Sequence, residues 1–107
     1  MKLTRRQLRR LIAESAGGLT PTQKLAQGFK GAGEDVAFIK QYFELAVTLG
    51  HAQDGTLDTI AQYGGGRIVD FVASPDLAVE LHKIMGQIKI GQDKRYPGMY
   101  YVAYAVN

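Results

Sequence analysis

The residues able to do chemistry are few in this chain, and their spacing matches no catalytic or metal-binding motif. The chain has no cysteine, which excludes thiolate nucleophiles, thiolate metal sites and disulfides. Its two histidines, His51 and His82, lack a zinc-ligand spacing, and Glu80 points to a different side of a predicted helix from His82. The two serines, Ser15 and Ser74, fall in a linker and at a helix cap. We therefore expect no enzymatic activity, no metal and no cofactor.

Two further stretches could bind a phosphate or a nucleic acid. Residues 64–67, Gly-Gly-Gly-Arg, could offer backbone N–H groups to a phosphate, but no Gly-Lys-Ser/Thr follows, which favours a flexible helix-to-helix connection. Residues 94–96, Lys-Arg-Tyr, precede Tyr100, Tyr101 and Tyr104, a mixture of cations and rings that single-strand binders use. The same tyrosines could instead pack in a terminal strand, or that strand could pair with a partner or a second copy.

The positive charge of the chain is concentrated in its first residues. The formal net charge of the 107 residues is +3. Residues 1–14 contain five basic residues and one acidic residue, a net charge of +4, whereas residues 15–107 contain eight basic and nine acidic residues, a net charge of −1. A basic arm on a nearly neutral body is typical of an interaction tail and disfavours a basic globular domain.

Residues 1–14 carry the signals of a short amphipathic helix. Thr4 is a predicted N-cap with Gln7 three residues later, and Leu3 and Leu8 occupy the positions of a hydrophobic staple. The apolar face of this predicted helix consists of Leu8, Leu11 and Ile12. The opposite face is cationic and consists of Arg5, Arg6, Arg9 and Arg10. A helix of about ten residues with like charges four apart is unstable alone in water. We therefore expect the arm to order on a binding surface.

This arm resembles the opening of small proteins from large tailed phages, and it is similar to the capsid-targeting peptide of T-even-like internal head proteins. The resemblance implies that a prohead protease cuts the chain after Glu14, since its pattern is Leu or Ile, any residue, then Glu. Ile12-Ala13-Glu14 fits this pattern, and Ser15 would begin the released body. The other three Glu residues lack the required apolar residue; Ala32, Tyr42 and Ala78 precede Glu34, Glu44 and Glu80 at that position.

The sequence therefore predicts a non-enzymatic phage virion protein, located inside or on the head and otherwise in the host cytoplasm. Leu3, Leu8, Leu11 and Ile12 would bind capsid or scaffold proteins, and Ile12, Glu14 and Ser15 would form the cleavage site. An alternative is an unprocessed module whose arm docks on a neighbouring subunit or binds DNA through its arginines. Two further alternatives stay open. The arm could be an ordinary N-terminal helix docked on the body, or the chain could be a small bacterial regulator or inhibitor.

The rest of the chain is predicted to be one small globular domain. Its 46% hydrophobic content is ordinary for a folded protein, and 107 residues leave no room for two domains. We expect the domain over residues 21–107, joined to the arm by a linker over residues 15–20. No apolar run approaches about 18 residues, so we expect no membrane span, and no signal-peptide pattern is visible.

The periodicity of the body predicts a mainly α fold with a small C-terminal β element. We expect a compact bundle of about four to five short helices, with helices over 21–30, 34–49 and 55–63 and another beginning at Ser74-Pro75-Asp76. Residues 67–73 fit a helical face better than an alternating strand, although a short buried strand stays open. Residues 100–106 alternate as a terminal strand, which could pair with residues 88–90.

Overall fold

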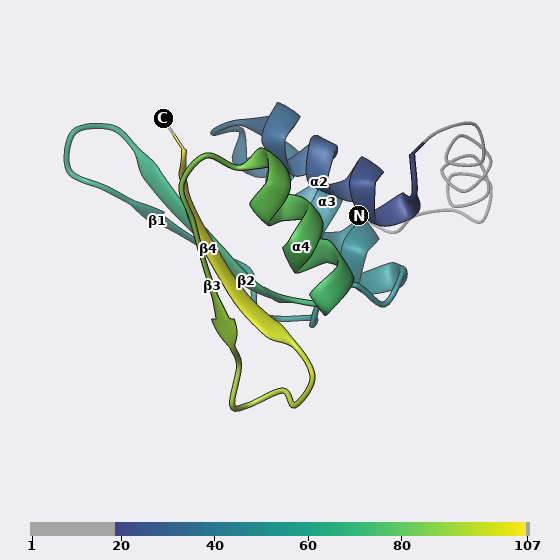
Figure 1. Cartoon of the computed structure of the whole chain (residues 1–107). Coiled ribbons are helices and arrows are strands. Elements are labelled where there is room, and N and C mark those ends of the chain that lie inside the picture. Colours follow the sequence, from purple (N-terminus) through teal and green to yellow (C-terminus); the bar gives the residue numbers. More distant parts are fainter. Residues whose placement is uncertain (1–18, 107) are drawn as a thin grey trace.

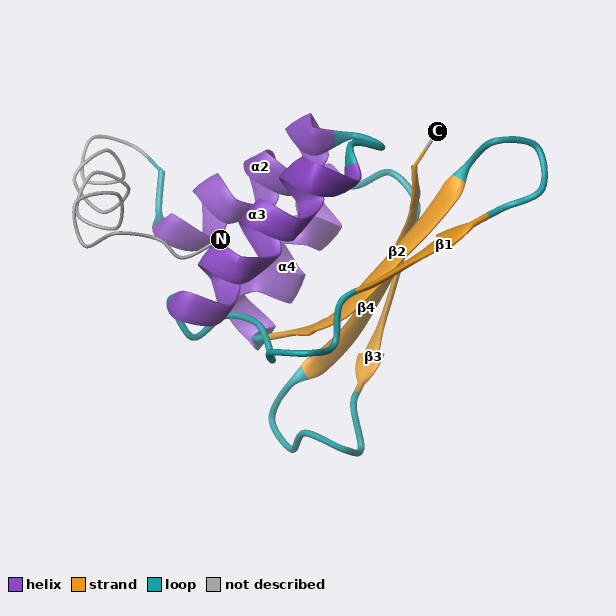
Figure 2. Ribbon diagram, turned by 180° about the vertical axis from the view of Figure 1, so that it is seen from behind, coloured by secondary structure: helices purple, strands orange, loops and turns teal. Residues whose placement is uncertain are grey.

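The computed structural model describes residues 19–106, which form two layers. Three helices lie together on one face of a four-stranded antiparallel sheet (Figures 1 and 2). The helices are α2 (Pro21–Ala32), α3 (Val36–Thr48) and α4 (Pro75–Ile84). The strands are β1 (Asp58–Ala61), β2 (Arg67–Ala73), β3 (Ile88–Gln92) and β4 (Tyr100–Val106). No helix among these residues is long and apolar enough to cross a bilayer.

A side chain caps the start of each of the three helices, and the predicted cap Ser74 at α4 is confirmed. Thr20 and Gln23 form a reciprocal capping box at α2, with hydrogen bonds of 2.9 and 3.2 Å. The Asp35 carboxylate accepts the N–H groups of the first turn of α3, and the Ser74 hydroxyl oxygen accepts the Leu77 N–H at the start of α4. Each cap satisfies N–H groups that have no partner inside the helix.

The predicted C-terminal hairpin is also confirmed. Strands β3 and β4 pair antiparallel, with Ile88 opposite Tyr104 and Ile90 opposite Val102. The order across the sheet is β1-β2-β4-β3, so the C-terminal strand β4 lies inside the sheet with a partner on both sides. The prediction that this strand could add to a partner or a second copy is therefore wrong, because its backbone groups are already paired. The edges are β1 and β3.

The four-to-five-helix bundle is wrong, because two segments predicted to be helical are strands. Residues 58–61, within the predicted helix 55–63, form strand β1. Residues 67–73, for which a helix was favoured, form strand β2. The two strands pair across residues 62–66, where Gly64 and Gly65 have φ of 98° and 96°. The glycine run is thus a β-turn region that needs positive φ, not a helix-to-helix connection.

The core lies between the helices and the inner face of the sheet. The Phe71 ring of β2 stacks on Phe29 of α2 at 4.9 Å between centroids, and meets the edge of Phe43 of α3 at 5.7 Å. Leu77 and Leu81 of α4 are fully buried in the same cluster. Every helix therefore contributes a buried apolar stripe to one contiguous core.

Glycine residues 28 and 31 of helix α2 give a matched test of this packing. A Cβ on Gly28 would lie 2.7 Å from Cζ of the Tyr42 ring on α3, whereas a Cβ on Gly31 would meet nothing within 4 Å. Replacing a helical glycine by alanine otherwise stabilises a helix by about 0.5–1 kcal/mol. We expect Gly31→Ala to raise the free energy of unfolding by that amount and Gly28→Ala to lower it, in urea denaturation. Equal effects of the two variants would contradict the close approach of α2 and α3.

Candidate functional site

The residues predicted to act in the arm lie outside the described part of the chain. These are the predicted partner-binding residues Leu3, Leu8, Leu11 and Ile12, the predicted cleavage residues Ile12, Glu14 and Ser15, and the four arginines of the alternative, Arg5, Arg6, Arg9 and Arg10. Their roles stay predictions.

The two histidines and Glu80 are not brought together as a site. His51 follows α3, whereas His82 lies exposed in the last turn of α4 beside Lys83. Glu80 pairs with Lys83 at 3.2 Å, one turn along the helix. Within residues 19–106, no three His, Cys, Asp or Glu side chains are grouped as metal ligands.

The tyrosines near the C-terminus do not form one stacking platform. Tyr104 belongs to the core on the inner face of the sheet, and Tyr100 packs against that core. Because side chains alternate along a strand, Tyr101 projects from the opposite face. Arg95 pairs with Asp93 at 3.1 Å and lies 5.6 Å from the centre of the Tyr96 ring, so part of its charge is already compensated. The side-chain geometry therefore does not favour single-strand nucleic acid on these rings.

The structure brings together two candidate residues that lie far apart in the sequence, His51 and Ser74. Their Nδ1 and Oγ atoms lie 2.9 Å apart. Backbone hydrogen bonds position the pair, because the His51 N–H donates to the Ala46 carbonyl and the Ser74 N–H donates to the His51 carbonyl, both at 2.8 Å. A bridge between Ala52 and Ala73 continues this contact. The two residues are 23 positions apart in the sequence, and no local pattern predicted their contact.

The chemistry of this pair is that of a helix cap rather than of a nucleophile. Ser74 Oγ accepts the N–H of Leu77 at 3.2 Å, so its hydroxyl proton is available to His51 Nδ1. A serine nucleophile needs its lone pairs free to attack, whereas this oxygen is held against the first turn of α4. His51 lines a polar cleft at the N-terminal ends of α2 and α4, together with Thr20, Gln23, Asp76 and Glu80. The two carboxylates oppose the binding of an anion there.

The face of the sheet opposite the helices carries a second polar cluster. The Tyr101 hydroxyl donates a 3.0 Å hydrogen bond to Asp70 Oδ2, and Asp58 lies directly across from Asp70 in the neighbouring strand. Desolvation of the Tyr101 hydroxyl raises its pKa, and the hydrogen bond to Asp70 and the negative charges of Asp70 and Asp58 add to the increase. The cluster thus holds a proton on the tyrosine rather than releasing one.

One buried polar atom of the described core has no hydrogen-bond partner. The Tyr104 hydroxyl lies beneath the helices, and its residue is only 3% exposed. Burial raises the pKa of this phenol far above its ordinary value, so the group stays neutral. Because the hydroxyl reaches neither solvent nor another polar side chain, it cannot contribute to a surface site.

No known protein family matches this chain, and neither a curated protein nor a solved structure matches it.

The double contact of Ser74 predicts a measurable loss of stability on truncation. Ser74→Ala removes the cap of α4 and the hydrogen bond to His51, and we expect a loss of about 1–2 kcal/mol in the free energy of unfolding. Ser74→Thr keeps the hydroxyl and should stay close to the parent protein. Urea denaturation followed by circular dichroism measures both. Equal stability of the two variants would contradict the capping role.

Tyr101 predicts a change of stability at alkaline pH. Its pKa is raised in the folded state, so the stabilising contribution of the protonated phenol is fully present below the unfolded pKa of about 10 and is lost as the pH rises through the folded pKa. We expect the stability difference between the parent protein and Tyr101→Phe to be constant from pH 7 to about pH 9.5 and to shift towards the variant above pH 10. Urea titrations of both proteins at each pH measure this difference. The contributions of ionisable groups that the two proteins share cancel in it. A difference independent of pH would contradict the Asp70 contact.

Proposed function

We propose that this chain is a non-enzymatic phage virion protein of the head, directed there by residues 1–14 and cut after Glu14 by a prohead protease. The observation that carries the proposal is that the net positive charge and the single Ile-x-Glu tripeptide fall in the same short segment. Capsid or scaffold proteins would bind the apolar face of this arm. The folded body would be the part retained in the virion.

The position of the predicted bond relative to the folded body supports this proposal. The bond between Glu14 and Ser15 precedes Leu19, the first residue described, and the capping box that begins α2 at Thr20. Cleavage there removes none of the described helices, strands or core residues. Cleavage would therefore leave the whole described fold on one product.

The use of the few polar groups in the body supports a non-enzymatic role. The only described serine caps α4, and the histidine beside it shares that cap. On the sheet face opposite the helices, Asp70 and Tyr101 form a hydrogen bond with each other. Groups held in this way stabilise the fold, which fits a role in binding.

The alternative is an unprocessed module whose arm binds DNA or a neighbouring subunit. The four arginines of the arm favour it, since each can contact a phosphate. The two functions predict opposite fates for the arm, because cleavage after Glu14 would remove every one of these arginines. The N-terminal residue of the protein recovered from virions distinguishes the two functions.

Cleavage is tested on the protein purified from phage particles, by intact mass and N-terminal sequencing. We expect the parent protein to begin at Ser15 and Glu14→Gln to begin at Met1, because the protease pattern requires the carboxylate. Glu34→Gln is the matched control, since Ala32 occupies the apolar position before it and processing should be unchanged. Recovery of the parent protein with Met1 intact would reject the processing and favour the alternative, for which DNA affinity should fall steeply with salt.

Targeting is tested separately from cleavage. Leu8→Asp combined with Leu11→Asp alters the apolar face and leaves residues 12–14 unchanged. We expect this double variant to be excluded from the phage head, measured as its copy number per particle. Arg5→Ala combined with Arg9→Ala should reduce packaging less. The reverse order of these effects would support the nucleic-acid function of the arm.

A further inference from the structure

An open apolar groove runs between α4 and the β3–β4 hairpin. It has a volume of about 430 Å³, and its lining residues are Pro75, Ala78, Val79, His82, Lys83, Ile90 and Tyr100. The helix contributes one continuous face, because these positions repeat at helical spacing. Val79 on this face is 52% exposed, one of the few large hydrophobic side chains so exposed among the described residues. The groove thus presents apolar surface to solvent on a small domain.

The groove lies beside an unpaired edge of the sheet. Strand β3 is the last in the order β1-β2-β4-β3, so within residues 19–106 only β4 pairs with it (Figure 1). Ile88 and Ile90 of β3 point towards the core, while Lys89 is exposed on the other face. An edge strand with a hydrophobic groove alongside it is the geometry by which domains bind extended peptides.

We propose that β3 and the groove form a binding site for an extended segment of another protein, which adds to the sheet as a fifth strand. Residues of that segment opposite Ile88 and Ile90 would share their face and enter the groove against Val79 and Tyr100. Residues between them would lie on the other face, where Lys89 projects. The backbone hydrogen bonds would supply affinity, and the alternate side chains would supply selectivity.

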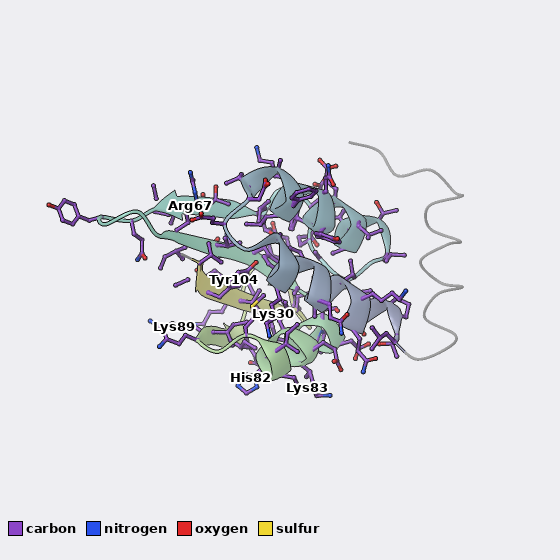
Figure 3. The ribbon with its side chains drawn as sticks, turned by 90° about the horizontal axis from the view of Figure 1, so that it is seen from above. Lys30, Arg67, His82, Lys83, Lys89 and Tyr104 are labelled. Carbon is purple, nitrogen blue, oxygen red and sulfur yellow. The ribbon has the colours of Figure 1, made fainter. Side chains whose placement is uncertain are left out.

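The positive charge near the groove favours an acidic peptide segment as the partner. His82 and Lys83 project outward from α4 and Lys89 from the neighbouring β3 (Figure 3). Lys83 pairs with Glu80, but Lys89 has no ion pair with any described residue, and none of the residues lining the groove is acidic. A carboxylate opposite Lys89 would form a favourable cross-strand pair. The partner is therefore a segment that alternates apolar and acidic residues.

The same charge argument disfavours two other occupants. The chain's own N-terminal arm has a net charge of +4 and would be repelled by Lys83 and Lys89. A second copy paired through β3 would bring another Lys89 and another His82-Lys83 pair to the same place. The other edge, β1, is less suited to an acidic segment, because it carries Asp58 in the row of paired residues where β3 carries Lys89.

The site is tested by selecting displayed random 12-residue peptides on the full-length protein and measuring the affinity of the enriched peptides. We expect enrichment of sequences in which apolar residues alternate with Asp or Glu, and perturbation of the backbone NMR signals of residues 88–92. Val79→Lys should weaken binding about tenfold or more, and Lys89→Glu about threefold with a weaker dependence on salt. Enrichment of basic peptides, or perturbation confined to β1, would overturn the proposal.

The matched control is Phe38→Lys, which alters an equally exposed apolar side chain, 51% exposed, on α3 and outside the groove. It should leave peptide affinity unchanged, and circular dichroism should show the parent fold for all three variants. Equal loss of affinity in Phe38→Lys and Val79→Lys would reject the groove as the site. A dimer that Val79→Lys dissociates in sedimentation equilibrium would reject a foreign partner in favour of a second copy.

Discussion

The contact on which the rest of this fold depends is the packing of Phe71 between Phe29 and Phe43. Phe71 projects from an interior strand, and the two rings that meet it come from α2 and α3, which are adjacent in the sequence. One fully buried side chain therefore fixes both helices over the same face of the sheet. Helix α4, which follows β2 directly, completes this layer with Leu77 and Leu81. No described helix remains for the opposite face, which explains why that face carries the Asp70–Tyr101 pair.

The one-sided arrangement also explains where the exposed apolar surface lies. Helix α4 buries Leu77 and Leu81 towards the centre of the sheet, so its residues 75, 79, 82 and 83 turn outward next to the edge strand β3. The hairpin extends beyond the helices at this edge (Figure 2). A groove is the consequence, because a helix of ten residues cannot cover both the interior strands and the edge. The candidate binding surface is thus a product of the same packing that stabilises the domain.

The sequence predicted the helices whose signals are local and missed the strands whose identity depends on partners. Thr20, Asp35 and Ser74 are caps that act within three residues, so their roles could be inferred without the fold. Strand β2 carries Ile68 and Val72 on the face opposite the helices as well as Val69 and Phe71 on the inner face, so residues 67–73 lack the alternation that distinguishes a strand from a helix. Residues 58–61 are a strand only because the glycine turn returns the chain to β2. The pairing of His51 with Ser74 was equally invisible, since it depends on the bridge that brings Ala52 to Ala73.

The distribution of charge gives the N-terminal arm and the groove a preference for the same acidic partners. Residues 1–14 have a net charge of +4, whereas residues 15–107 have a net charge of −1 and place His82 and Lys83 in the lining of the groove beside β3. At physiological salt, charges more than about 8 Å apart are largely screened, so a partner at the groove would respond to Lys83 and Lys89 rather than to the net charge of the body. A basic arm retained on the chain would compete for acidic partners of the groove, because both attract the same carboxylates. Removal of the arm after assembly would end that competition, which makes processing and peptide binding compatible steps rather than alternatives.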